Sequence, residues 1–186
     1  VLHIVAEPNL PYVFMGLTAN FSFANSLVQF LFFQPESNFS RENLSQHDDL
    51  HKKTFGEGAE IDALGNPDQG QGWYSKTLPY KDWHKINTAQ RIAGNYIESF
   101  PILIIFSTLS GFFFTNIAVG LIWAIFVARI LYAFGYKIAP GFRGPGFLIV
   151  MVSQITMIIL ALLASFKTYL TKYDIIINSR HYVKNL

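Results

Sequence analysis

The sequence has 186 residues, of which 51% are hydrophobic and only 14% are charged. Fourteen Lys and Arg against twelve Asp and Glu give a net charge of +2, which argues against nucleic acid as a partner. The sequence contains no cysteine, which excludes disulfides, thiolate metal sites, iron–sulfur clusters and a cysteine nucleophile. A charged fraction this low is unusual for a soluble protein.

Three stretches of the chain have no charged residue at all: 8–35, 99–128 and 144–166. A bilayer core requires about 20 apolar residues per helix, so each stretch is long enough to span a membrane. Thr115 and Asn116 interrupt the middle stretch, which therefore belongs to two helices. We predict an all-α integral membrane protein, a single domain over 1–186 built as a four-helix transmembrane bundle. The expected helices are at about 10–33, 84–110, 115–137 and 146–170.

The remaining segments are polar. Residues 34–83 carry nine acidic and five basic side chains and are rich in Gly, Asn, Gln, Asp and Ser, which predicts an inserted loop. Residues 173–186 are predicted to be a polar tail. His47 and His51 are spaced to share one face of a helix, but no third ligand accompanies them, so we predict a solvated loop without a metal site.

The second predicted helix carries a polar stripe. Asn87, Arg91, Asn95 and Glu98 recur at spacings of four, four and three, so they share one helix face. An ionisable side chain that faces lipid costs about 2.5 to 3.5 kcal/mol, so the stripe should face the bundle interior, a neighbouring subunit or a water-filled site. A purely structural ion pair between Arg91 and Glu98 is the alternative.

The third predicted helix ends in a similar stripe of Arg129, Tyr132 and Tyr136. Such residues are also common interfacial anchors, which is the alternative reading here. The second helix enters the bilayer on the side where the third leaves it, so we expect the two stripes to converge. The following turn adds Arg143 to that side.

Three arginines, a glutamate, an asparagine and two phenols suit a small zwitterionic ligand. Guanidinium groups bind carboxylates through two hydrogen bonds, and a glutamate is a natural partner for an amino group. A tripeptide such as glutathione has these groups.

The two stripes also carry a family resemblance. The run 87–98, followed by Phe100 and Pro101, looks like the second-helix signature of the MAPEG family, the membrane-associated proteins of eicosanoid and glutathione metabolism. The run 128–136 is similar to the motif at the end of that family's third helix. The resemblance extends from about Ile86 to Phe166 and is strongest to the third type of microsomal glutathione transferase.

The resemblance implies a left-handed four-helix bundle that assembles as a homotrimer, with active sites between subunits near the cytosolic face. Glutathione would be the co-substrate of a transferase or lipid-hydroperoxide peroxidase that acts on a lipid-like electrophile or hydroperoxide arriving through the membrane lipid. The positions that match the family's glutathione-binding residues are Arg91, Asn95, Glu98, Arg129, Tyr132 and Tyr136.

Arg143 lies seven residues after Tyr136, where the leukotriene-synthase branch of the family has an arginine that stabilises the glutathione thiolate. The resemblance therefore implies a catalytic role for Arg143. Ser99 stands where that branch has a tyrosine, so leukotriene synthesis itself is not the expected activity. Ala93 and Gly94 replace a His-Gln pair that close relatives commonly carry.

A second hypothesis starts from the predicted loop 34–83. Long polar loops are typically mobile unless something holds them, and a larger membrane assembly could do so. The chain would then be a transferase-like accessory subunit, for example in the mitochondrial respiratory chain, with catalysis reduced or lost. The resemblance favours the endoplasmic reticulum membrane, and the second hypothesis favours a mitochondrial membrane.

Overall fold

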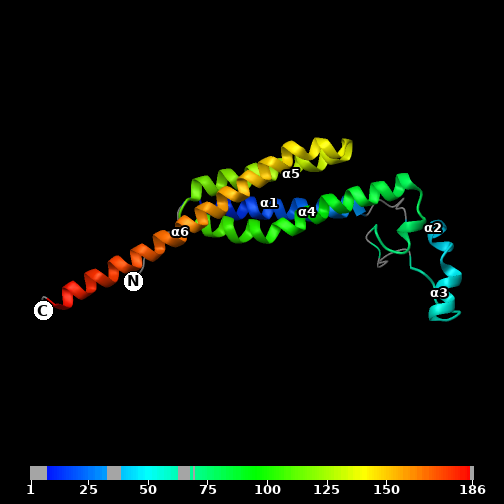
Figure 1. The fold of residues 1–186 in the computed structure, drawn as a ribbon, viewed down its shortest axis with the longest axis horizontal. Helices are drawn as coiled ribbons and strands as arrows, with labels where there is room; N and C mark the ends of the chain where they lie inside the picture. The colour runs from blue at the N-terminus through cyan, green and yellow to red at the C-terminus, as the bar shows by residue number, and fades with distance from the viewer. Residues whose placement is uncertain (1–7, 33–38, 63–67, 69, 185–186) are drawn as a thin grey trace. The chain divides into compact units, whose positions relative to one another are not determined.

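The computed structural model describes residues 8–32, 39–62, 68 and 70–184, in which the regular elements are helices (Figure 1). In chain order they are α1 (Leu10–Phe32), α2 (Arg41–Ser45), α3 (Asp48–Phe55), the 3-10 helix η1 (Ser75–Thr77), α4 (Tyr80–Gly111), α5 (Thr115–Ile138), the 3-10 helix η2 (Pro140–Arg143) and α6 (Gly144–Lys184).

Four long helices lie where the sequence predicts them, with two differences at their ends. Helix α4 begins at Tyr80 instead of about residue 84, and α6 continues to Lys184 through most of the segment predicted as a polar tail. Among the described residues, three stretches are long and apolar enough to cross a membrane: Tyr80–Gly111, Thr115–Ile138 and Pro140–Leu170. The fourth long helix, α1, is not among these stretches. Polar residues such as Asn20 interrupt it and lower its mean hydropathy.

The chain divides into two compact units. The bundle unit comprises Val1–Phe21 with Glu98–Leu186, and the polar unit comprises Ser22–Ile97. Helices α1 and α4 each contribute to both units.

The core of the bundle unit receives side chains from four helices. Its buried residues are Val13 of α1, Leu103 of α4, Ala118, Ile122, Ile125 and Ala128 of α5, and Val150 and Met157 of α6. Asn20 is buried beside this core, and its amide nitrogen donates to the carbonyls of Gly16 (2.8 Å) and Ile122 (3.3 Å). Because its donor is satisfied, the buried amide joins α1 to α5 without a large desolvation cost.

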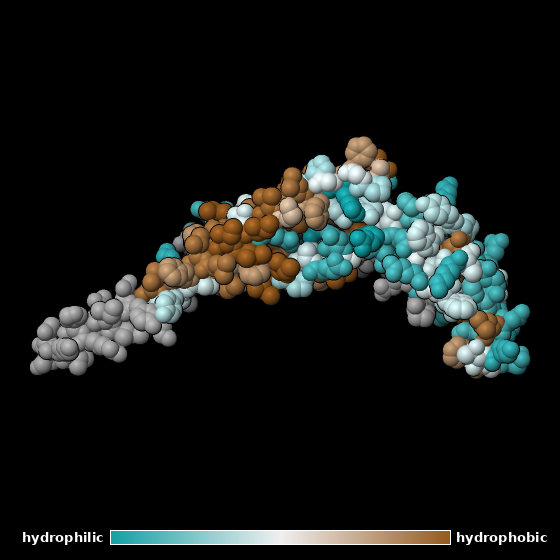
Figure 2. Space-filling model, in the orientation of Figure 1, coloured by the Kyte–Doolittle hydropathy of each residue, from teal (hydrophilic) through white to brown (hydrophobic). Residues whose placement is uncertain are grey.

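The outer surface of the bundle unit is apolar. Figure 2 shows hydrophobic side chains gathered over α5 and α6, and Leu131, Phe134 and Leu162 are among those that are about half or more exposed. A soluble protein rarely exposes apolar area on this scale, whereas membrane helices present it to lipid. The bundle unit is therefore built for a bilayer.

The polar unit corrects the prediction of a loop over 34–83, because the described part of this segment contains α2, α3 and η1. Helix α2 begins after Ser40, whose hydroxyl accepts from the Asn43 amide. Helix α3 has two aspartates in its first turn and two lysines in its last, which complement the helix dipole. Arg41 donates two hydrogen bonds to Asp48 (2.7 and 2.6 Å), and this pairing lowers the pKa of the Asp48 carboxyl.

A turn centred on Asp68 ties the segment to the start of α4. Burial of the Asp68 carboxylate opposes its ionisation, but hydrogen bonds from the amides of Ser75, Gly72 and Gly70 and from the Ser75 hydroxyl outweigh burial and lower its pKa. The Asn87 amide nitrogen on α4 then donates to the Gly70 carbonyl, 2.8 Å away. Hydrogen bonds within the chain therefore connect this part of the segment to α4.

Candidate functional site

Hydrogen bonds to Ser99 of α4, one of them from a buried arginine, connect three helices of the bundle unit. The side chain of Arg129 on α5 is only 4% exposed, and its guanidinium donates to the hydroxyl of Ser99 on α4. The Gln154 amide nitrogen on α6 donates to the Ser99 carbonyl, 3.4 Å away. A buried charge is costly unless hydrogen bonds compensate it. Arg129 therefore joins α5 to α4, and Gln154 joins α6 to the same residue of α4.

The two tyrosines of the α5 stripe lie one turn further along the helix. Their ring centroids are 5.9 Å apart, and the rings are inclined at 56°. Tyr132 is buried, whereas Tyr136 is half-buried at the end of α5. Tyr136 therefore lies at the edge of the bundle, where its ring contacts Arg143.

Arg143 is held over Tyr136. Its guanidinium carbon lies 4.8 Å from the centroid of the Tyr136 ring, a cation–π contact. Two glycines allow η2 and the start of α6 to approach α5 closely. A Cβ at Gly135 would lie 2.3 Å from the Phe142 carbonyl oxygen, and a Cβ at Gly146 would lie 2.5 Å from the Tyr132 amide nitrogen. The backbone on both sides of Arg143 is thus packed directly on α5.

The two charged residues of the α4 stripe are exposed. Arg91 and Asn95 belong to the polar unit, where Arg91 is exposed and Asn95 is half-buried, and Glu98 is exposed at the start of the α4 section in the bundle unit. An exposed ionisable residue on a membrane helix suits a subunit contact or a water-filled site. The structure thus brings Tyr132, Tyr136 and Arg143 together within one unit, and it places Arg91 and Asn95 in the other.

Two contributors to this region were missed from the sequence. Ser99 was considered only as a departure from the tyrosine of a family branch, yet its hydroxyl is the partner of Arg129. Gln154 was not considered, although it is an amide inside the charge-free stretch 144–166. An amide in such a stretch is a signal in itself, because it requires a partner inside the bundle.

The comparison with known protein families agrees with this arrangement. The MAPEG family model matches residues 52–163, well over half of the chain. The chain belongs to the MAPEG family. No curated protein matches it at a significant level. The family includes glutathione transferases and related enzymes, and its members generally use glutathione.

The match starts well before the two helix motifs that carry the resemblance. It begins at Lys52 in α3, so it includes most of the described polar segment ahead of α4 as well as α4, α5 and the first half of α6. MAPEG membership and the three apolar helices confirm the prediction of a multi-pass helical membrane protein.

Proposed function

We propose that this MAPEG protein is a glutathione-dependent transferase or lipid-hydroperoxide peroxidase similar to the third type of microsomal glutathione transferase. The observation that carries the proposal is Arg143, a cation fixed over Tyr136 at the end of a membrane helix. In this proposal α1 is the fourth span of a transmembrane bundle. The membrane is that of the endoplasmic reticulum.

The side chains present match the groups of glutathione. Its carboxylates require cations, for which Arg91 is exposed on α4, and its amino group requires an acid, for which Glu98 is exposed about two turns further along the same face. Asn95 lies between them and offers an amide to the peptide backbone. Arg129 supports the site through Ser99 instead of binding the ligand, because its guanidinium is buried.

Arg143 acts on the charge of the thiol. A free thiol has a pKa of about 8.5, so only a few per cent is ionised at neutral pH. A guanidinium beside the sulfur favours the anion and lowers that pKa, and the half-exposed position of Arg143 lets the proton pass to water. When bound, glutathione supplies the nucleophile that attacks an electrophilic lipid or a lipid hydroperoxide.

Tyr132 and Tyr136 form the wall of this site. Tyr136 keeps the Arg143 guanidinium in place through its ring face, and Tyr132 lies behind it in the bundle. The exposure of Arg91 and Glu98 on α4 supports a homotrimer in which a neighbouring copy covers the stripe and completes the site.

The first test extracts the native assembly that contains this chain in mild detergent. Its mass and its binding of glutathione are then measured. A homotrimer that binds glutathione supports the proposal. A single copy inside a heteromeric complex, without glutathione binding, supports instead an accessory subunit that contacts its partners through residues 34–83.

The second test is Arg143→Ala, with Lys137→Ala as the control because Lys137 is an exposed cation near the same end of α5. Loss of one unit of thiol pKa depression leaves about tenfold less thiolate at neutral pH. We expect Arg143→Ala to lose about that much glutathione-dependent activity and ultraviolet thiolate absorbance while the assembly stays intact. Unchanged activity in this variant removes the role assigned to Arg143.

A further inference from the structure

A compact turn in the polar unit lies against the first residue of the α4 stripe. It comprises residues 68 and 70–75, and we name it the Asp68 turn. The Asp68 carboxylate accepts hydrogen bonds of 2.7–2.9 Å from the amides of Gly70, Gly72 and Ser75. A Cβ at Gly72 would lie 2.7 Å from the carboxyl carbon, so the backbone wraps closely around this side chain. One buried carboxylate therefore fixes the shape of the turn.

Asn87 fastens the Asp68 turn to α4. Its amide nitrogen donates to the Gly70 carbonyl, 2.8 Å away, and to a backbone carbonyl one turn earlier in α4, 2.9 Å away. Gly70 has a φ of +91°, and a Cβ there would lie 2.8 Å from the Ile86 side chain, so this contact requires glycine. Asn87 is therefore engaged in holding the turn. The part of the stripe that a ligand can use begins with Arg91, which is exposed.

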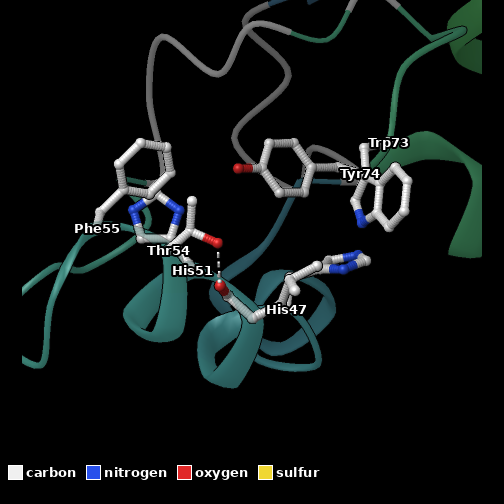
Figure 3. Close-up of a pocket in the computed structure, with 7 residues that line it drawn as sticks. His47, His51, Thr54, Phe55, Trp73 and Tyr74 are labelled. Carbon is white, nitrogen blue, oxygen red and sulfur yellow. Dashed lines mark hydrogen bonds between the residues drawn. The ribbon is translucent and has the colours of Figure 1, made fainter.

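The segment that joins α2 to α3 holds the C-terminal end of the Asp68 turn. The Tyr74 and His47 rings have centroids 5.2 Å apart. The hydroxyl of Thr77, just after the turn, lies 3.1 Å from the Nε2 atom of His47. Figure 3 shows Trp73, Tyr74 and His47, which form part of the wall of a ring-lined pocket of about 230 Å³. The turn is thus held from two sides, which makes it a fixed wall.

This wall lies one helical turn before Arg91 on the same face of α4. Four residues separate Asn87 from Arg91, a rise of about 6 Å. Long side chains of a helix lean toward its N-terminus and cover the preceding turn. The Arg91 side chain is therefore directed toward the place where Gly70 rests on Asn87. A carboxylate that pairs with the Arg91 guanidinium would lie beside the Asp68 turn.

The face of α4 is open on the other side of Arg91. A Cβ at Gly94 would meet no atom of the described part of the chain within 4 Å. A peptide along the α4 stripe is thus obstructed at Asn87 and free to continue past Gly94. We propose that the Asp68 turn closes the Arg91 end of the glutathione site and selects peptides that end there in a free carboxylate. This inference rests on the proposed function, and Asn87 and Asp68 act in it as positioning residues.

The selectivity follows from the length of a peptide unit. One more residue after the glycine of glutathione moves the terminal carboxylate by about 3.5 Å. With the wall in place, the longer peptide cannot extend past Arg91 and loses the pairing of its carboxylate with the guanidinium. Loss of a charge-assisted pair of this kind weakens binding by about tenfold or more.

The direct test measures binding of two ligands to the full chain in mild detergent by equilibrium dialysis. They are glutathione and glutathione extended by one glycine. We expect wild type to bind the extended peptide at least about tenfold more weakly. Asn87→Ala releases the turn from α4, so the two affinities should become similar. Lys85→Ala, which removes an exposed side chain two residues earlier, is the control and should keep the wild-type ratio.

The ratio of affinities separates selectivity from folding, because both ligands are measured on the same sample and a loss of folded protein affects them equally. Equal wild-type affinities for the two peptides overturn the proposal. A wild-type ratio in Asn87→Ala overturns it as well.

A second variant tests the wall without altering its hydrogen bonds to Asp68 or Asn87. Gln71 is an exposed residue of the turn, and Gln71→Glu adds an acid that competes for Arg91. We expect glutathione to bind about threefold more weakly at low salt. The glycine ethyl ester of glutathione, which has no charge at that end, should be unaffected. Lys53→Gln is the control, because it makes the same change in net charge at an exposed position of α3. Equal effects of Gln71→Glu on both ligands, or none, contradict the proposal.

Failure of the two proposals can be told apart. If wild type does not bind glutathione, the proposed function fails and the role of the turn fails with it. If glutathione binds and the variants leave its selectivity unchanged, the proposed function stands and the role of the Asp68 turn is refuted.

Discussion

The close approach of η2 and α6 to α5 can be tested with one methyl group at Gly146. A Cβ there would lie 2.5 Å from the Tyr132 amide nitrogen, 2.6 Å from the Ala128 carbonyl oxygen and 2.8 Å from the Tyr132 Cα. Ordinary contacts begin near 3.4 Å, so the two helices must separate by roughly 1 Å. All three atoms belong to the backbone, and no side chain can turn away to relieve the clash.

The cost can be bounded from general values. Overpacking of this kind destabilises by about 1–3 kcal/mol, whereas Gly to Ala inside an unobstructed helix stabilises by about 0.5–1 kcal/mol. Gly120 offers a control because it lies inside α5 and a Cβ there meets nothing within 4 Å. We therefore expect Gly146→Ala to be less stable than wild type and Gly120→Ala to be as stable or more so.

The assay is thermal unfolding in detergent, followed by intrinsic tryptophan fluorescence. A loss of 1–3 kcal/mol corresponds to a midpoint lowered by roughly 2–10 °C for a chain of this size. Glutathione-dependent activity should fall in parallel, because Arg143 lies three residues before Gly146 and shifts with it. Equal midpoints for Gly146→Ala and Gly120→Ala would refute the close packing of α6 on α5.

Three further outcomes are expected. Arg91→Leu should weaken glutathione binding measured by equilibrium dialysis, and an unchanged affinity would assign the α4 stripe to structure alone. Folding lowers the pKa of Asp68, so the ionised carboxylate stabilises the folded chain at neutral pH. This contribution is lost as the pH falls below about 4 and through the lowered pKa. The protection factor of the Ser75 amide against hydrogen exchange should fall there in wild type and should already be low at neutral pH in Asp68→Asn. A protection factor that is independent of pH would contradict this. Ser99→Ala should lower the free energy of unfolding by about 1–3 kcal/mol, because Arg129 loses a hydrogen-bond partner. An unchanged free energy of unfolding would show that other contacts of Arg129 compensate for its buried charge.

Part of the polar segment was predictable from signals that the sequence analysis did not use. Asp48 and Asp49 followed by Lys52 and Lys53, with Gly56 just beyond, is a typical pattern for a short helix, and it forms α3. The turn around Asp68 was not predictable in the same way. Its hydrogen bonds form only when Gly70, Gly72 and Ser75 fold around one carboxylate.

The sequence by itself determined the class and the family of this protein. Long charge-free stretches predict membrane helices whatever the tertiary structure is. Helix periodicity is likewise a local property, and it places the spaced polar residues of α4 and of α5 on one face of each helix. The motifs on these helices predicted the MAPEG family, and the family match confirmed it.

Only the tertiary structure decided which side chains meet. Arg129 and Ser99 are 30 residues apart and Gln154 and Ser99 are 55 apart, so no local pattern specifies their contacts. The pairing depends on how α4, α5 and α6 pack, and the position of Arg143 depends on glycines that let η2 approach α5. The ring-lined pocket of the polar unit likewise required the fold, because it joins α3 to residues about 20 positions further along the chain. Helix packing and loop closure are non-local, and that is why they were decided by the structure.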